Sequence, residues 1–446
     1  MELLENHHTF LARCTEARTY ALSLDNPLIV HHYDADGIAS GSIVMAAFLK
    51  EKKPFRSVCI KKLDDFIIDQ LKAQNERNII FVDLGSGNKR VNEFENVVII
   101  DHHQPLLDIN VKQHVNCMLF GIDGGEELSA ASTVYLVFRE RIDLAITGAV
   151  ADQQAPLHGF NRYILEEGVA KGEVTIENDL CFYGRYARPL LQFLSLSDDP
   201  YIPGISYHED RALQLLTDLN IPLKDGEKWR VYADLDETEK KKLVNALVDI
   251  LVSSGSHRKA AHLIGESYTF PKHPKDETYE ASEFSTLLNA CGRHNAHEIA
   301  VGVCLNNSEA FQKSKQLLLH HKQLIRQGIE YSFVNRQDFG KFYFLDGRGV
   351  IDEGIIGIIC GITLQYNATK PMLGVSRGDH NTIKFSARGT KSLIANGLNL
   401  GEIMIRTSKE VGGIGGGHKI AAGASIPEDK LNEFLLAVGA SLRPLS

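Results

Sequence analysis

Short apolar runs alternate with helical patterns through the first third of the chain. The apolar runs lie at residues 26–32, 57–63, 78–85 and 97–105. Segments with helical periodicity at residues 37–52 and 64–74 separate the first three runs. Because each run is apolar throughout rather than alternating, we expect strands that are buried on both faces. Strands that alternate with helices predict an α/β N-terminal lobe, with a parallel sheet and flanking helices.

The chain after this sheet is predominantly helical in pattern. Residues 129–141 predict a helix, and another apolar segment follows at 144–154. Helices are expected at 210–220 and 236–255, followed by a charged, proline-containing connector at 267–282. We interpret this middle stretch as a helical insertion or linker.

The last third of the chain predicts a second, smaller α/β lobe. Its expected elements are a strand at 297–307, a long helix at 308–333, a strand at 341–347 and a capped helix at 352–366. Residues 370–390 alternate like two paired strands around a turn at Gly378–Asp379.

Length and composition limit the possible classes of protein. A chain of 446 residues suggests two or three domains, which we place at 1–195, 196–294 and 295–446. No apolar run approaches the roughly 18 residues of a membrane-spanning helix, so no membrane is expected. Seven scattered cysteines without a CxxC pair fit a reducing cytoplasm rather than a disulfide framework or a zinc finger. The net charge of -9 does not mark a nucleic-acid binder, although a cleft can be locally basic.

Titratable side chains gather at the ends of the predicted strands. The segment HHYDADG ends the first strand, the third run reaches Asp83, and the fourth ends on the triplet DHH. In open parallel sheets ligands bind at the carboxyl ends of the strands, so these side chains should converge there. The candidates are His32, Asp34, Asp36, Asp83, Asp101, His102, His103 and Asp152.

This mixture of carboxylates and imidazoles indicates a metal site. Carboxylates that are brought together without partners repel one another and have raised pKa values. Divalent cations remove that cost, and a ligand set without thiolates suits manganese or magnesium better than structural zinc. We therefore expect two divalent cations that share a bridging ligand, with Mn²⁺ favoured and Mg²⁺ possible.

Each residue taken alone has a simpler interpretation. An aspartate after a strand is usually a helix N-cap, which would describe Asp83 or Asp152. A pair of histidines is more often at the surface or in the core. Four such clusters in one half of the chain are hard to explain as caps. His31 should point to the opposite face of the strand from His32, so we interpret it as structural.

Four segments in this order, HHYDADG, FVDLG, DHHQP and GAVAD, resemble the motifs of the DHH phosphoesterase superfamily. Near the end of the chain, GGIGGGHKIAAGASIP resembles the GGGH signature of the associated DHHA1 domain. Together the two regions resemble RecJ-like exonucleases, and EFSTLLNACGR resembles their archaeal branch. Bacterial RecJ typically carries Asp where His32 stands, whereas archaeal relatives often have His there.

The resemblance implies a role for each candidate in the first lobe. His32 and Asp34 would hold one metal ion, and Asp83 would bridge to the second. The ligands of the second ion would be Asp36, His102 and Asp152. Asp101 would orient the adjacent imidazole, and His103 would face the scissile phosphate.

The second lobe is basic within an acidic protein and contains a glycine-rich segment. The segment GGIGGGH can curl its backbone N–H groups around an anion, although such runs are more often flexible hairpins or linkers. The candidates for gripping a substrate phosphate are Arg377, Ser386, Arg388, Gly416, Gly417 and His418.

The resemblance therefore implies a metal-dependent exonuclease that degrades single-stranded nucleic acid, DNA before RNA, in repair or replication. A helicase or a replisome protein is a possible partner. The same motifs also resemble phosphodiesterases for short oligonucleotides, cyclic dinucleotides or 3′-phosphoadenosine phosphate. A third alternative is a catalytically inactive replication scaffold, which would be expected to have lost metal ligands.

Overall fold

The computed structural model describes residues 4–197, 200–365, 369–378 and 381–442. The chain forms two compact units, Met1–Leu317 (unit 1) and Leu318–Ser446 (unit 2). Each unit has hydrophobic clusters of its own. Asp379 of the expected turn lies outside the described residues.

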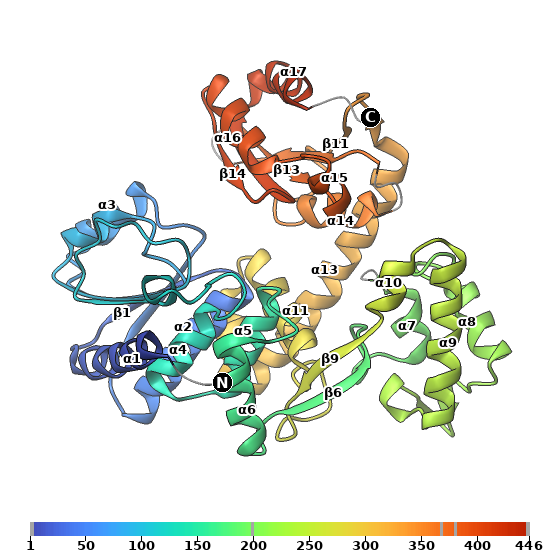
Figure 1. Ribbon diagram of the computed structural model, residues 1–446, viewed down its shortest axis with the longest axis horizontal. Helices are drawn as coiled ribbons and strands as arrows, with labels where there is room; N and C mark the ends of the chain where they lie inside the picture. The colour runs from blue at the N-terminus through green and yellow to red at the C-terminus, as the bar shows by residue number, and fades with distance from the viewer. Residues whose placement is uncertain (1–3, 198–199, 366–368, 379–380, 443–446) are drawn as a thin grey trace. The chain divides into compact units, whose positions relative to one another are not determined.

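Unit 1 is built on a five-stranded parallel sheet (Figure 1), in the order β2-β1-β3-β4-β5. The strands are β1 Leu28–His32, β2 Arg56–Ile60, β3 Asn78–Val82, β4 Asn96–Asp101 and β5 Gln113–Asn116. The first four confirm the predicted strands and with them the α/β fold of the first lobe. The strand β5 was not predicted, because its sequence QHVN contains no apolar run.

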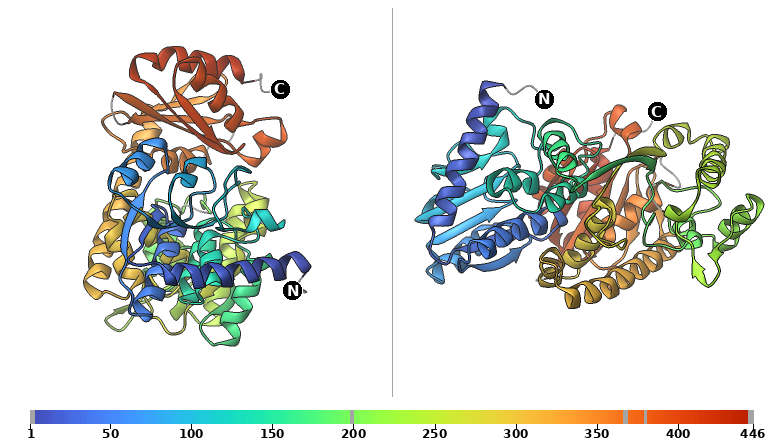
Figure 2. Two further views of the ribbon diagram at one scale, coloured as in Figure 1. Left: turned by 90° about the vertical axis from the view of Figure 1, so that its left-hand side faces the viewer. Right: turned by 90° about the horizontal axis from the view of Figure 1, so that it is seen from below.

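Helices cover both faces of this sheet. They are α1 Glu5–Ser23, α2 Ala35–Lys50, α3 Asp65–Ala73, α4 Ala130–Phe138, α5 Ile142–Ala151 and α6 Gly159–Ala170, with short 3₁₀ turns η1 Lys89–Glu93 and η2 Cys117–Phe120. Helix α3 packs on the face that carries Val30 and Phe81. Helices α2 and α4 contact each other on the opposite face, and α1 lies along β5 (Figure 2). There His31 lies against α2, and burial lowers its pKa to about 4, which fits a structural residue.

A helical insertion within unit 1 is joined to the rest of that unit by an antiparallel pair of strands, β6 Thr175–Leu180 and β9 Ile264–Thr269. It contains α7 Leu190–Ser195, α8 Glu209–Asp218, η3 Tyr232–Asp234, α9 Glu237–Ser253, α10 His257–Ala261 and the short hairpin β7 Lys224–Asp225 and β8 Lys228–Trp229. Helices α8 and α9 confirm the predicted ones, and they pack around a cluster that includes Leu216 and Leu247. The predicted connector contributes part of strand β9, which the sequence did not reveal.

The strand expected at residues 297–307 is wrong. The structure has the helix α12 His297–Cys304 here, which follows α11 Ala281–Arg293, and both helices pack against α2 within unit 1. The apolar residues of α12 that are buried, Ala300, Val303 and Cys304, recur at helical spacing. Residues 299–305 contain no charged residue, so this spacing becomes apparent only once packing against α2 shows which side chains are buried.

A buried ionic cluster ties the insertion to α11. The guanidinium of Arg185, only 1% exposed, donates to Glu280 at 3.0 Å and lies 3.2 Å from Glu177. Glu283 is fully buried beside this cluster, and its Oε2 has no hydrogen-bond partner among the described residues. Burial, together with the charge of Glu280, raises the pKa of Glu283 above its ordinary value.

We expect Glu283→Gln to stabilise the protein at neutral and alkaline pH. Because the pKa of this carboxyl is raised in the folded state, the folded protein is more stable while the carboxyl is protonated. As the pH rises above the pKa of the unfolded state, near 4.3, the free energy of unfolding falls. Removing the charge should raise the free energy of unfolding at pH 8 by about 1–3 kcal/mol. Urea unfolding at pH 4 and pH 8 measures this, and an equal effect at both pH values would contradict it.

Unit 2 contains a mixed six-stranded sheet in the order β10-β11-β12-β13-β15-β14, which confirms the smaller α/β lobe. Its strands are β10 Gln337–Asp338, β11 Tyr343–Asp346, β12 Met372–Arg377, β13 Thr382–Arg388, β14 Ile414–Gly417 and β15 Ala421–Pro427. Its helices are α13 Ser308–Asn335, which begins in unit 1, α14 Ile356–Leu364, α15 Lys391–Ala395, α16 Leu400–Glu410, η4 Glu428–Lys430 and α17 Leu431–Ser441. Across the described residues of the whole chain, no helix is both long and apolar enough to span a membrane.

Candidate metal centre

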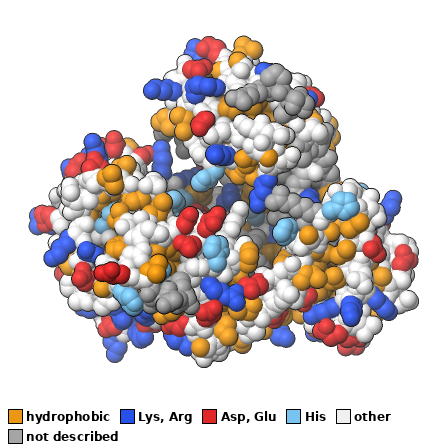
Figure 3. Space-filling view, viewed as in Figure 1, with side chains coloured by type: hydrophobic (Ala, Val, Ile, Leu, Met, Phe, Trp, Pro, Cys, Tyr) orange, Lys and Arg blue, Asp and Glu red, His pale blue; other side chains and the backbone are white. Residues whose placement is uncertain are grey.

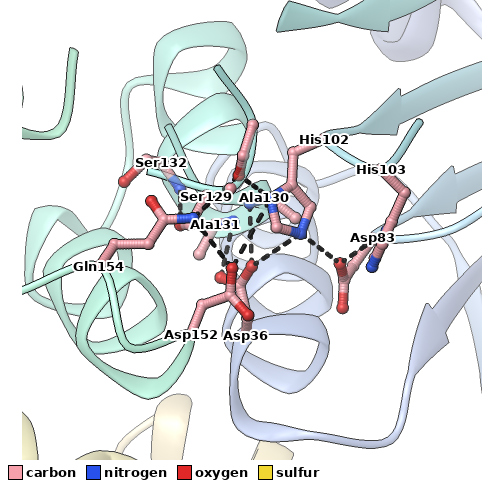
Figure 4. Close-up of polar contacts among 12 residues, drawn as sticks. Asp36, Asp83, His102, His103, Ser129, Ala130, Ala131, Ser132, Asp152 and Gln154 are labelled. Carbon is pink, nitrogen blue, oxygen red and sulfur yellow. Dashed lines mark hydrogen bonds and ion pairs between the residues drawn. The ribbon is translucent and has the colours of Figure 1, made fainter. Parts of the chain in front are cut away.

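The candidate ligands converge at the carboxyl ends of β1, β3 and β4, as the sequence predicted for this edge of the sheet. His32 is the last residue of β1, and Asp83 directly follows β3. Asp101 is the last residue of β4, and His102 and His103 follow it. Asp152 directly follows α5. Figure 4 shows the His102 ring between Asp83 on one side and the carboxylates of Asp36 and Asp152 on the other. Acidic and histidine side chains reach the surface side by side on this unit (Figure 3).

Asp83 lies at the centre of the cluster and is 2% exposed. Its Oδ2 lies 3.3 Å from His32 Nδ1, and its Oδ1 lies 3.4 Å from His102 Nε2. Burial alone would raise the pKa of Asp83, but the two histidines hold it well below its usual range. Asp83 therefore keeps its negative charge deep inside the protein.

Both histidines turn one ring nitrogen to a backbone carbonyl and the other to the carboxylates. Nε2 of His32 contacts the carbonyl of Lys61 at 3.2 Å, and Nδ1 of His102 contacts the carbonyl of Gly124 at 2.6 Å. A carbonyl only accepts hydrogen bonds, so these two nitrogens carry protons, and His32 Nδ1 and His102 Nε2 are the atoms that would bind a metal ion. Burial lowers the pKa of both histidines, but the neighbouring carboxylates raise it above the ordinary value. Metal-binding histidines are commonly fixed in this way by a backbone carbonyl.

Two further carboxylates of this cluster, Asp36 and Asp152, are held by a helix end and by an amide. Asp36 accepts from the N–H groups of Ala130 and Ala131 at the start of α4, each at 2.9 Å. Asp152 accepts from Gln154 Nε2 at 2.9 Å. Burial raises the pKa of both carboxyls, and the negative charge of Asp83 nearby raises it further.

The ligand atoms form three groups in which all atoms lie within 4.8 Å of one another. The groups are Asp83, His102 and His103; His32, Asp34 and Asp83; and Asp36, His102 and Asp152. Two of the central atoms, His32 Nδ1 and Asp83 Oδ1, are buried without a hydrogen bond among the described residues. Buried oxygen and nitrogen atoms that make no hydrogen bond, in a set without thiolates, fit the ligands of divalent cations.

Asp101 and His103 form a separate pair beside the cluster. The Oδ1 of Asp101 accepts from His103 Nδ1 at 2.8 Å, and its Oδ2 accepts from the N–H of Ser86 at 2.9 Å. The hydrogen bond to Asp101 raises the pKa of His103 above its ordinary value. The imidazole that Asp101 orients is therefore that of His103, whose side chain is 57% exposed.

In unit 2 the structure brings most of the expected phosphate ligands together. Ser386 and Gly416 flank Gly423 on the two neighbouring strands, which places their backbones about 10 Å apart. The Ser386 hydroxyl and the Arg388 guanidinium both lie beside the first turn of α14. His418 follows β14 and its N–H donates to Ala421, the residue opposite Arg388.

Two expectations for unit 2 need correction. Arg377 pairs with Ile383, five positions along β12 from the residue opposite Arg388, so about 16 Å of strand separates the backbones of the two arginines. Because five is an odd number of positions, their side chains also leave opposite faces of the sheet, and Arg377 is not placed to grip the same phosphate as Arg388. The glycine segment is not a curled loop either, because Ile414–Gly417 forms the edge strand β14 in a hairpin with β15.

Three domain models match parts of the chain. They are the DHH family N-terminal domain over residues 26–154, the DHH-CID domain over 182–264 and the DHHA1 domain over 341–443. The uncharacterized protein MJ0831 of Methanocaldococcus jannaschii is 32% identical over 426 residues, which cover 92% of this chain and 91% of that protein. The chain belongs to the DHH family.

Solved structures show that this DHH protein has a RecJ-like fold. RecJ from Thermus thermophilus, in complex with Mn²⁺, matches with a TM-score of 0.60 at 17% identity, over 99% of this chain and 55% of that one. The chain thus spans about half the length of that RecJ. CDC45 from Entamoeba histolytica matches with a TM-score of 0.61 at 14% identity, over 97% of this chain and 98% of that one. The family and the metal-binding groups together support a metal-dependent phosphoesterase.

Sequence reasoning missed the residues that position the ligands of this DHH protein. Gln154 donates to both Asp152 and the Gly124 carbonyl, and it accepts from Asn161. Gln154 lies two positions after Asp152 in the sequence, so its position next to a candidate ligand could have marked it as a residue of the site. Gly124 and Asn161 reach the site only through the fold, and nothing in the local sequence marked them.

We expect Gly148→Ala to weaken metal binding. A Cβ on Gly148 would collide with Asp36 Oδ1 and would lie 2.5 Å from the Cβ of Ala131, so Asp36 would have to move. Displacing a ligand in this way should lower Mn²⁺ affinity by roughly 10–100-fold, measured by calorimetry. Gly87→Ala is the matched control, because a Cβ there meets nothing within 4 Å. Unchanged affinity in Gly148→Ala would show that Asp36 is not a ligand.

Proposed function

We propose that this protein is a hydrolase that degrades single-stranded nucleic acid, DNA in preference to RNA, by two-metal hydrolysis. The observation that carries the proposal is the set of three ligand groups, in which Asp83 and His102 each belong to two. A ligand shared between groups is what a pair of closely spaced ions requires. Mn²⁺ is the favoured ion and Mg²⁺ the alternative, since both accept oxygen and imidazole ligands.

The proposed ligand roles are those that the resemblance to the DHH family implies. His32, through Nδ1, and Asp34 would hold one ion, and Asp83 would bridge the two ions. The ligands of the second ion would be Asp36, His102 through Nε2, and Asp152. When bound, such ions lower the pKa of a shared water and clamp the phosphoryl oxygens.

The pair Asp101–His103 would act on the substrate rather than on the metal. Asp101 accepts the Nδ1 proton, so a protonated His103 ring directs its second N–H, on Nε2, away from Asp101. The raised pKa of His103 favours this protonated form near neutral pH. His103 would therefore donate a hydrogen bond to the scissile phosphate and stabilise its negative charge.

Unit 2 would hold the strand away from the scissile bond. Ser386, Arg388, Gly416, Gly417 and His418 offer a hydroxyl, a guanidinium, backbone groups and an imidazole for a substrate phosphate. A domain organisation of 1–195, 196–294 and 295–446, a helicase or replisome partner, and a place in DNA repair or replication belong to the same proposal. The seven free cysteines support work in a reducing cytoplasm.

We expect His418→Ala to lower cleavage without loss of metal. One hydrogen bond to a charged group contributes about 1.5–3 kcal/mol, which corresponds to roughly ten- to a hundredfold in kcat/KM. Arg377→Ala is the control, because Arg377 lies at the other end of the sheet from Arg388 and should change cleavage by less than about threefold. Loss of bound Mn²⁺ in His418→Ala would make His418 a metal ligand and would contradict its assigned role.

Two other functions share parts of this site. A phosphodiesterase for short oligonucleotides, cyclic dinucleotides or 3′-phosphoadenosine phosphate would use the same metal ligands. An inactive replication scaffold is suggested by the likeness in fold to CDC45. The complete set of six candidate metal ligands, which lie close together in the structure, favours an active enzyme.

The assay that tests the proposal uses one single-stranded oligonucleotide labelled at either the 5′ or the 3′ end. With Mn²⁺, mononucleotides should be released progressively from one end, and a blunt duplex of the same sequence should resist. EDTA should stop the reaction. Cleavage that is confined to dinucleotides or cyclic dinucleotides would favour the small-substrate enzyme, and no hydrolysis of any phosphodiester would favour the scaffold.

A further inference from the structure

Helix α11 contacts the metal-binding segment at two points. The side-chain Oδ1 of Asn289 accepts from the N–H of Ala35 at 3.0 Å. A Cβ on Gly292 would overlap the carbonyl oxygen of Tyr33, so the helix backbone approaches this carbonyl closely. Asn289 and Gly292 are three positions apart and therefore lie on one face of α11.

The two contacted residues alternate with the ligands of the first segment. Tyr33 and Ala35 lie between His32, Asp34 and Asp36 in the sequence. The backbone of the segment therefore rests on α11 at the positions between the ligands. This arrangement can set the direction of the ligand side chains without touching them.

Asn289 satisfies a backbone group that the helix α2 cannot satisfy itself. The first N–H groups of a helix have no partner within the helix. At the start of α2, the Asp34 side chain accepts from Gly37 N at 3.0 Å, and Asn289 accepts from Ala35 N. Asp34 is expected to bind metal with its other oxygen, so the amide of Asn289 leaves that carboxylate available.

The helix that carries Asn289 is firmly placed. Leu287, Leu288, Ala290 and Cys291 are fully buried, and α11 packs against both α2 and α5. Asp152 directly follows the last residue of α5, so α11 packs against two helices that carry or adjoin candidate ligands, α2 with Asp34 and Asp36 and α5 with Asp152. A polar group on a rigid helix holds its target more accurately than one on a loop.

We propose that Asn289 is a positioning residue of the metal centre, which fixes the segment from His32 to Asp36 through its hydrogen bond to Ala35. The inference rests on the metal site proposed above. Removing an outer hydrogen bond of this kind lowers metal affinity by roughly 10–100-fold. Asn289→Ala should therefore bind Mn²⁺ that much more weakly, while Asn289→Asp, which keeps an acceptor oxygen at the same place, should stay within a few-fold of the wild type.

The test is the Mn²⁺ affinity of the full-length protein, measured by calorimetry, together with the thermal midpoint of each apo variant. Thr286→Ala is the matched control, because Thr286 lies on the same helix and its hydroxyl donates to the helix backbone. A loss confined to Asn289→Ala, with restoration by Asn289→Asp, supports the role. Wild-type affinity in Asn289→Ala overturns it, as does an equal loss in Thr286→Ala. If the wild-type protein itself binds no Mn²⁺, the metal site fails rather than the role of Asn289.

Discussion

Asp83→Asn should reduce cleavage by about a thousandfold or more. Asp83 lies beside both histidines, and it is the carboxylate that belongs to two of the ligand groups found among the described residues. Metal ions contribute several kcal/mol to such reactions, and each 1.36 kcal/mol changes the rate tenfold. The amide has the same shape as the carboxylate, so the fold should persist while both ions are weakened.

The matched control for this substitution is Asp108→Asn. Asp108 lies in the connection between β4 and β5. Its side chain is exposed, and it belongs to none of the ligand groups among the described residues. Single-turnover cleavage of a labelled single strand compares the two variants. Activity of Asp83→Asn within tenfold of the wild type would mean that Asp83 does not bridge the ions.

A fragment ending at Leu317 should bind Mn²⁺ normally but cleave long single strands poorly. All candidate metal ligands and the hydrophobic cluster around the parallel sheet belong to unit 1. The fragment loses the Ser386, Arg388 and His418 contacts of unit 2. Two charge-assisted hydrogen bonds contribute about 3–6 kcal/mol, so kcat/KM should fall roughly 10²–10⁴-fold.

The same fragment separates binding from chemistry. Hydrolysis of a small phosphodiester, such as a dinucleotide, should fall far less than hydrolysis of a long strand, because the small substrate reaches fewer contacts. Calorimetry with Mn²⁺ checks that the fragment retains its ions. Undiminished cleavage of long strands by the fragment would remove unit 2 from the substrate path.

The first lobe could be predicted from its sequence because its signals are local. Each of the strands β1, β3 and β4 is a continuous apolar run, and Asp83 and the triplet at Asp101 follow such runs directly. Alternation on the sheet likewise separated His31, which is buried against α2, from His32. The ligand groups in the structure bring together side chains from the ends of β1, β3 and β4, as expected if the carboxyl ends of these strands meet at one edge of the sheet.

Other features depended on contacts that a local pattern cannot reveal. The segment 297–307 is apolar enough for a strand, and its burial against α2 decides that it is helical. Arg377 and Arg388 share a hairpin in the sequence, but the register places them at opposite ends of it. Asn289 reaches Ala35 across 254 positions of sequence, and only the fold brings them together.

The number of Mn²⁺ ions bound per chain is the most direct test of the two-metal site. The protein is dialysed against EDTA, returned to buffer and titrated with Mn²⁺ while free ion is followed by electron paramagnetic resonance. The wild-type protein should bind two ions, and Asp83→Asn should bind fewer at the same free Mn²⁺ concentration. Two ions in both proteins would contradict the bridging role of Asp83, and none in the wild type would contradict the metal centre itself.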